Sequence, residues 1–221
     1  MKAIKLKDIG YMPIPKVACT SIKNTFFKIK ENRDYDPTID YGNHIHQYWE
    51  KNKENISDTS FKFIIIREPI KRFLSAYSNR VCHHKELSLA KIQQSNPKIA
   101  GAFEIYTPGL GQFIDNFEQY NRVNSINHHC KPVSEWVNGD MSIFDKIYPL
   151  ENIAELQSDL TSVLNQEVIF PREQTGGRKI MIQDLSRNQV DFLMEFYRQD
   201  YQLLRKYYNF DDFWKEWKKG L

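Results

Sequence analysis

The stretch FKFIIIREPIKRFLSAY, residues 61–77, decides how this chain folds. Its first six residues form an apolar run rich in β-branched side chains, which is typical of a parallel strand buried on both faces. Pro69 then falls near the first position of a helix, where its missing N–H costs little. One apolar face of that helix is supplied by Ile70, Phe73, Leu74, Tyr77 and Val81.

Strands and helices alternate on either side of this stretch. Residues Ile9–Ile14 predict a short strand, which an amphipathic helix beginning at Thr20 or Ser21 follows. Residues Ile143–Tyr148 predict a third strand, before a helix whose apolar residues are Ile153, Leu156, Leu160, Val163 and Leu164. This alternation favours an α/β fold with a mostly parallel sheet.

The C-terminal half contributes mainly helices. Leu110–Phe117 predicts one, and the capping box Ser186–Gln189 opens a long one. Between the two halves, Lys85–Pro108 is polar, and we expect an irregular, flexible or substrate-facing insertion. Because no repeat, low-complexity segment or Gly/Ser/Pro linker divides the chain, we expect a single domain over residues 1–221.

Composition excludes several classes of protein. The 31 Lys and Arg against 28 Asp and Glu give a net charge of +3, which is too weak to argue for a nucleic-acid partner. No run of about 18 apolar residues predicts a membrane span, and the basic N-terminus lacks the apolar core of a signal peptide. Three cysteines fit a reducing compartment. We therefore expect a cytoplasmic, prokaryotic-like protein.

Two segments carry the signals for phosphate binding. The first, PKVACTSIK at residues 15–23, lies between a predicted strand and a predicted helix, where backbone N–H groups and the helix dipole attract phosphate. Lys16 supplies a charge, and Thr20 and Ser21 supply hydroxyls. The Walker A pattern is absent, which argues against a nucleoside triphosphate with Mg²⁺. An ordinary loop with a solvated lysine and a helix cap is the alternative.

The second segment begins at Arg67, at the carboxyl end of the buried strand, where open α/β sheets bind ligands. Arginine can clamp a phosphate through two bonds, and Ser75, about two helical turns further on, can add a third. The alternative is a surface arginine paired with Glu68 and a serine in a helix interior. One ligand with phosphates at both ends would use both segments.

Together the segments resemble the signature of PAPS-dependent carbohydrate sulfotransferases, the family of the chondroitin, dermatan, HNK-1 and heparan sulfate 2-O-sulfotransferases. Residues 15–23 are similar to the 5′-phosphosulfate loop, P-K-V-x-C-T-S/N-x-K. Residues 67–77 are similar to the 3′-phosphate motif, R-[DE]-P-x-x-R-x-x-S-A-Y. Residues 197–204 resemble the closing helix, Y-x-x-D-[FY]-x-L-[FL].

The resemblance implies a P-loop NTPase-like three-layer fold, with a mostly parallel central sheet flanked by helices. It also implies PAPS as the sulfuryl donor, adenosine 3′,5′-bisphosphate as the product, and no metal. Lys16 would stabilise the leaving phosphate, while the 3′-phosphate would be held by Arg67 and Ser75. The 5′-phosphate would be bound by Ala18, Cys19, Thr20 and Ser21. Arg178 and Lys179 would close over the cofactor, although a solvated turn is the alternative there.

Sulfuryl transfer to a hydroxyl needs a base that titrates near neutral pH, and histidine meets this condition. The His44-Ile45-His46 segment resembles the His-x-His of heparan sulfate 2-O-sulfotransferase, which implies that His46 is the base and that His44 lies on the substrate side. Paired surface histidines are the alternative.

A second histidine cluster begins at His128 and resembles the family's D-x-H-W-x-P segment. The chain departs from that pattern, because Ile126 replaces the Asp and His129 replaces the Trp. We therefore assign His128 to the substrate side. Adjacent histidines and Cys130 without a second pair of ligands do not predict a metal site.

The sequence therefore predicts an enzyme that moves a sulfuryl group from PAPS to a hydroxyl, on a carbohydrate acceptor, in polysaccharide biosynthesis. Two alternatives stay open. A kinase-like phosphotransferase on the same architecture would need Mg²⁺ and a Walker A lysine. A non-catalytic module would bind an anionic glycan or a nucleotide without turnover.

Overall fold

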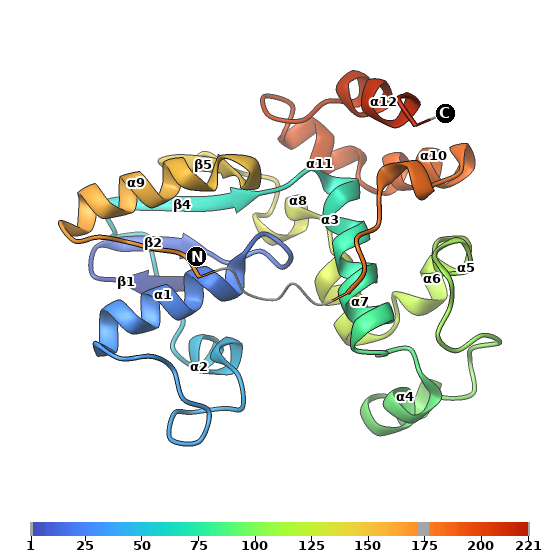
Figure 1. The fold of residues 1–221 in the computed structure, drawn as a ribbon, viewed down its shortest axis with the longest axis horizontal. Helices are drawn as coiled ribbons and strands as arrows, with labels where there is room; N and C mark the ends of the chain where they lie inside the picture. Colours follow the sequence, from blue (N-terminus) through green and yellow to red (C-terminus); the bar gives the residue numbers. More distant parts are fainter. Residues whose placement is uncertain (1, 172–176, 221) are drawn as a thin grey trace. The chain divides into compact units, whose positions relative to one another are not determined.

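The structure is a computed structural model that describes residues 2–171 and 177–220. The chain forms two compact units (Figure 1). The first consists of Met1–Arg67 and Met141–Thr175, and the second of Glu68–Asp140 and Gly176–Leu221. The expected single domain over residues 1–221 stays a prediction.

An open sheet of five strands, in the order β3-β1-β2-β4-β5, organises the first unit. The neighbours β2–β4 and β4–β5 are parallel, whereas β1 is antiparallel to both β2 and β3. A sheet with parallel central strands and flanking helices confirms the predicted α/β, P-loop-like class. The strands are β1 (Lys2–Leu6), β2 (Ile9–Met12), β3 (Glu54–Asn55), β4 (Phe61–Ile66) and β5 (Lys146–Pro149).

Two strand predictions need correction, and two strands, β1 and the two-residue β3, were not predicted. The predicted strand Ile9–Ile14 ends at Met12, and the predicted strand Ile143–Tyr148 begins only at Lys146. Residues 2–6 form β1, which pairs with β2 as a hairpin. Lys2 and Lys5 flank the apolar residues Ala3 and Ile4, so the sequence showed no apolar run that would predict this strand. The turn of the hairpin contains Lys7, which has a φ of 52°.

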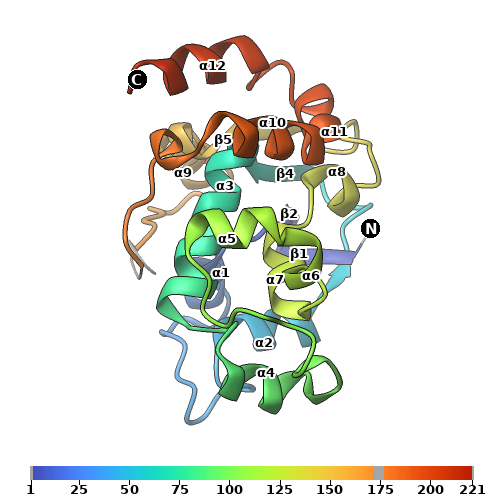
Figure 2. The same ribbon diagram turned by 90° about the vertical axis from the view of Figure 1, so that its right-hand side faces the viewer.

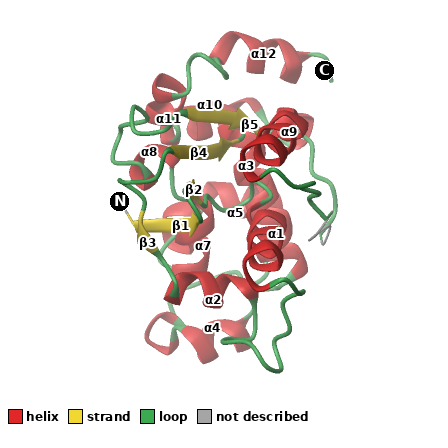
Figure 3. Cartoon of the chain, turned by 90° about the vertical axis from the view of Figure 1, so that its left-hand side faces the viewer, coloured by secondary structure: helices red, strands yellow, loops and turns green. Residues whose placement is uncertain are grey.

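Helices α1 (Cys19–Glu31) and α9 (Ile153–Leu164) lie on the same face of the sheet, as Figures 1 and 3 show. Phe26 of α1 packs edge-to-face on Tyr11 of β2 and Phe63 of β4, with ring centroids 6.0 and 6.3 Å away. This contact fixes α1 directly beside the strand that precedes it. The short helix α2 (Ile45–Lys51) packs against α1, and a 3₁₀ turn, η3 (Leu150–Asn152), precedes α9.

The second unit is helical, with α4 and α12 at its opposite ends (Figures 1 and 2). Its first helix, α3, continues into a π-helical segment, η1. Its elements are α3 (Pro69–Ala76), η1 (Tyr77–His83), α4 (Leu89–Ser95), η2 (Pro97–Ile99), α5 (Leu110–Asp115), α6 (Phe117–Tyr120), α7 (Asn124–Cys130), α8 (Val133–Trp136), η4 (Ile182–Asp184), α10 (Arg187–Phe196), α11 (Arg198–Leu203) and α12 (Phe210–Lys218).

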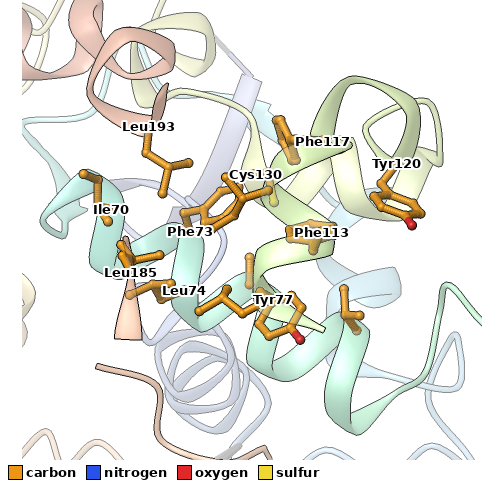
Figure 4. Packing of buried hydrophobic residues seen from close by; sticks show 14 of the residues in the cluster. Ile70, Phe73, Leu74, Tyr77, Phe113, Phe117, Tyr120, Cys130, Leu185 and Leu193 are labelled. Carbon is orange, nitrogen blue, oxygen red and sulfur yellow. The ribbon is translucent and has the colours of Figure 1, made fainter. Parts of the chain in front are cut away.

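The core of this unit gathers around Phe73 of α3, whose ring lies 5.5 Å from that of Phe113 and 5.2 Å from that of Phe117 (Figure 4). The segment expected to be an irregular insertion takes part in this core, because it forms α4 and buries Leu87, Ile92 and Phe103. The capping box at Ser186 is confirmed, but the long helix that it opens breaks at Tyr197 into α10 and α11.

Candidate active site

The loop between β2 and α1 has an unusual backbone. Lys16 and Ala18 adopt positive φ angles of 69° and 64°, which cost of order 1–3 kcal/mol each in residues other than glycine. A left-handed Ala18 followed by the helical Cys19 turns successive N–H groups to one side, as in anion-binding nests. No side chain of the described residues caps α1, so its first N–H groups suit an anion.

Arg67 joins this loop from the neighbouring strand. Its Nη1 donates a hydrogen bond of 3.3 Å to the carbonyl oxygen of Lys16. Because β2 and β4 are parallel neighbours, their carboxyl ends lie at the same edge of the sheet. The structure therefore brings Arg67, the first residue of the second predicted segment, into contact with the loop of the first. A lysine, an arginine, helix amides and two hydroxyls form a donor set that fits phosphate or sulfate groups.

His46 lies beside the same loop, in the first turn of α2. Its Nε2 is 3.1 Å from Oγ1 of Thr20, which belongs to the first turn of α1. His44 caps α2 by accepting a hydrogen bond of 3.2 Å from the backbone N–H of His46. The two imidazole rings stack at a centroid distance of 4.7 Å. The predicted base and the predicted phosphate loop therefore touch through one hydroxyl.

Lys23 completes this cluster; it is the last residue of the motif at residues 15–23, but the sequence predicted no role for it. Its Nζ lies 2.7 Å from Nδ1 of His46, and the residue is only 7% exposed. Burial lowers the pKa of the Lys23 amine below its usual value. The carbonyl oxygen of Lys23 accepts a hydrogen bond of 2.9 Å from Trp49 of α2. A signal existed, since Lys23 falls one turn after Thr20 on the same helix face.

The remaining predicted residues belong to the second unit. Ser75 is half-buried in α3, and His128 is exposed on α7 with its ring centroid 5.0 Å from that of Trp136. Arg178 and Lys179 are exposed, and the carbonyl oxygen of Arg178 accepts a hydrogen bond of 2.6 Å from Ser78. Their roles toward a ligand stay predictions.

The closing motif in residues 197–204 holds the second unit together. The carboxylate of Asp200 accepts hydrogen bonds of 2.8 Å from the backbone N–H groups of Val133 and Ser134, at the start of α8. The hydroxyl of Tyr197 donates to the carbonyl of Cys130, and that of Tyr201 donates to Glu68.

Glu68 in turn caps α3 by accepting a hydrogen bond of 2.7 Å from the backbone N–H of Lys71. The motif therefore anchors the start of the helix that carries Ser75. This is a structural role in positioning a predicted ligand residue.

Among residues 2–171 and 177–220, no group of three or more His, Cys, Asp or Glu side chains could hold a metal ion. Over the same ranges, no helix combines the length and the apolar character needed to cross a membrane. All three cysteines are described, and none forms a disulfide.

A nest at the start of a helix, an arginine from the adjacent parallel strand and a nearby histidine define an α/β protein whose carboxyl sheet edge carries groups that suit an anionic ligand. A sequence model described as the sulfotransferase family matches residues 5–209. The chain belongs to the sulfotransferase family, which confirms the resemblance and supports a sulfuryl-transferring enzyme. Neither a curated protein nor a solved structure matches the chain.

Proposed function

We propose that this protein transfers a sulfuryl group from PAPS to a hydroxyl of a carbohydrate, with His46 as the general base. The observation that carries the proposal is the distance of 3.1 Å between Nε2 of His46 and Oγ1 of Thr20. A base that acts on an acceptor must stand within reach of the group being transferred. Contact with the phosphate loop meets this condition.

The donor side of the reaction uses the loop and its arginine. PAPS, when bound, supplies an activated sulfuryl group. Lys16 offsets the charge that grows on the leaving phosphate, and the N–H groups from Ala18 to Ser21 bind the 5′-phosphate. Arg67 binds the 3′-phosphate. The assignment of Ser75 to that phosphate, and of Arg178 and Lys179 to the cofactor, rests on the sequence motifs.

On the acceptor side, His46 takes the proton from the attacking hydroxyl. His44 orients this base, since it caps the helix of His46 and stacks on its ring. We assign His44 and His128 to the acceptor side.

A hollow of about 520 Å³ beside α2 supports a sugar as the acceptor. It is lined by an aromatic ring, amides and charged side chains, a mixture that suits the faces and hydroxyls of sugars: Tyr41, Gly42, Asn43, Gln47, Glu50 and Lys51. Gln47 directly follows the proposed base.

The proposal is tested by separating binding from transfer. Adenosine 3′,5′-bisphosphate should raise the melting temperature of the wild type, and Lys16→Ala should reduce this shift. His46→Ala should keep the shift but lose transfer of radiolabelled sulfate from PAPS to a panel of oligosaccharides by about 10²–10⁴-fold. Lys28→Ala is the control for Lys16→Ala, because Lys28 is an exposed lysine on α1, the helix that follows the loop of Lys16.

Three outcomes would contradict the proposal. Full transfer by both Lys16→Ala and His46→Ala excludes the mechanism. Stabilisation by ATP with Mg²⁺ but not by the bisphosphate favours a phosphotransferase. Binding of the bisphosphate without turnover on any acceptor indicates a non-catalytic module.

A further inference from the structure

A buried amine lies against the proposed base on the side away from Thr20. Nζ of Lys23 is 2.7 Å from Nδ1 of His46, while Nε2 of the same ring faces the Thr20 hydroxyl. The backbone of Lys23 is fixed against α2, because its carbonyl oxygen accepts a hydrogen bond from the indole N–H of Trp49. A buried lysine of this kind must have a polar partner. In this protein the partner is the imidazole.

We propose that Lys23 is a positioning residue for His46: its amine holds Nδ1 of the ring, shares one positive charge with it, and leaves Nε2 to exchange the proton. This inference rests on the proposed function only for its catalytic consequence. The shared charge is a property of the free protein.

The distance explains why the charge is shared. Two positive charges 2.7 Å apart in a partly buried site repel each other, so an ammonium at Lys23 disfavours an imidazolium at His46. When protonated, the pair therefore carries one charge rather than two, and it titrates as a unit. With the charge on Lys23, its N–H donates to Nδ1, and the neutral ring carries its proton on Nε2.

The neutral pair is the form that accepts a proton from an acceptor. In that form Nδ1–H donates to the amine, and the lone pair of Nε2 is open to the hydroxyl. When the acceptor O–H bond breaks, its proton forms the new bond to Nε2, and the proton on Nδ1 passes to Nζ. The acceptor oxygen keeps the electron pair for the bond to sulfur, and the positive charge ends on the ammonium of Lys23.

Other charged groups act on this pair from α1 and from the region of α2. Cys19 and Glu50 raise the pKa of Lys23, and Lys53 lowers it, but burial is the largest influence and lowers it. The ring of His44 stacks on that of His46. The amine of Lys23 makes its contact with Nδ1 of His46 at 2.7 Å.

Nuclear magnetic resonance titration of His46 in the free protein tests the shared charge. In the wild type we expect the ring to stay neutral well below pH 6.5, the ordinary histidine value. In Lys23→Met, which keeps an unbranched side chain one atom shorter and removes the charge, the midpoint should rise to about 6.5. Lys28→Met, on the exposed face of α1, should leave the His46 titration unchanged.

Kinetics supply the second readout. Activity falls at low pH when the neutral pair takes up its first proton. The pair binds this proton more tightly than a lone histidine does, so the acid limb of kcat should move to lower pH in Lys23→Met. The plateau of kcat should fall, while KM for PAPS should change little.

The proposal is overturned if wild-type His46 titrates near 6.5, a result that needs no variant to fold. It is also overturned if a folded Lys23→Met leaves the titration of His46 unchanged. Absence of sulfation by every form of the protein would refute the proposed function alone, because the titration would still decide the role of Lys23.

Discussion

The carboxylate of Asp200 lies 3.9 Å from the guanidinium of Arg72, and both side chains are fully buried. The remaining polar atoms of this pair are largely satisfied by the backbone. Arg72 donates to the carbonyl oxygens of His129 and Lys131, at 3.1 and 2.7 Å. These hydrogen bonds link α3 and α11, which are remote in sequence, to residues 129–134, where α7 ends and α8 begins.

Asp200→Asn should destabilise the protein by about 3–5 kcal/mol, because the buried charge of Arg72 loses its compensating partner. Unfolding in urea, followed by tryptophan fluorescence, measures this loss. Asp191→Asn is the control, since Asp191 makes an exposed ion pair with Arg187. Equal stability of the two variants would contradict the prediction.

Arg67→Lys should weaken the binding of adenosine 3′,5′-bisphosphate by about 10–100-fold, since a lysine cannot bind a phosphate through two parallel bonds. It also loses the guanidinium hydrogen bond to the Lys16 carbonyl. Calorimetric titration measures the affinity. Arg187→Lys, at an exposed site on α10, should bind like the wild type. Unchanged affinity in Arg67→Lys would remove this residue from the proposed site.

Glu68 predicts a dependence of stability on pH. Burial raises the pKa of its carboxyl above the ordinary value of 4.5, although hydrogen bonds from Tyr201 and from two backbone N–H groups act in the opposite direction. The folded state therefore binds more protons than the unfolded state, so this group's contribution to stability decreases as the pH rises above 4.5.

The free energy of unfolding should consequently fall less steeply with pH in Glu68→Gln than in the wild type. Urea unfolding between pH 4.5 and 8 measures the two slopes. Glu195→Gln, whose carboxyl is exposed, should keep the wild-type slope. Parallel curves for Glu68→Gln and the wild type would disprove the raised pKa.

Gly177→Ala should be destabilising by about 1–3 kcal/mol. Gly177 has a φ of 101°, and a Cβ there would lie 2.7 Å from the carbonyl oxygen of Ser78. Gly101→Ala is a matched control, because a Cβ at Gly101 would meet no atom within 4 Å. Thermal unfolding of the two variants compares them, and a loss in Gly101→Ala as large as that in Gly177→Ala would refute this explanation.

The sequence predicted those features that depend on local pattern. The apolar run of β4 and the proline at the start of α3 predicted the strand and the helix. Two long motifs singled out the loop of Lys16 and Arg67, which the structure places in hydrogen-bond contact. β1 escaped notice because its lysines interrupt a strand that only its partners stabilise. Lys23 was missed because its burial depends on α2, which packs on α1 only in the folded chain. The break at Tyr197 likewise depends on tertiary contacts.

The two ends of the sheet have a consequence for how copies of this protein behave in solution. One outermost strand, β3, has only two residues, both exposed, and the other, β5, ends in a proline and carries Lys146. An incoming strand needs a row of unpaired N–H and C=O groups, and a short strand, a proline and a charge all interrupt such a row. In the described part of the chain, the sheet thus offers little template for edge-to-edge aggregation.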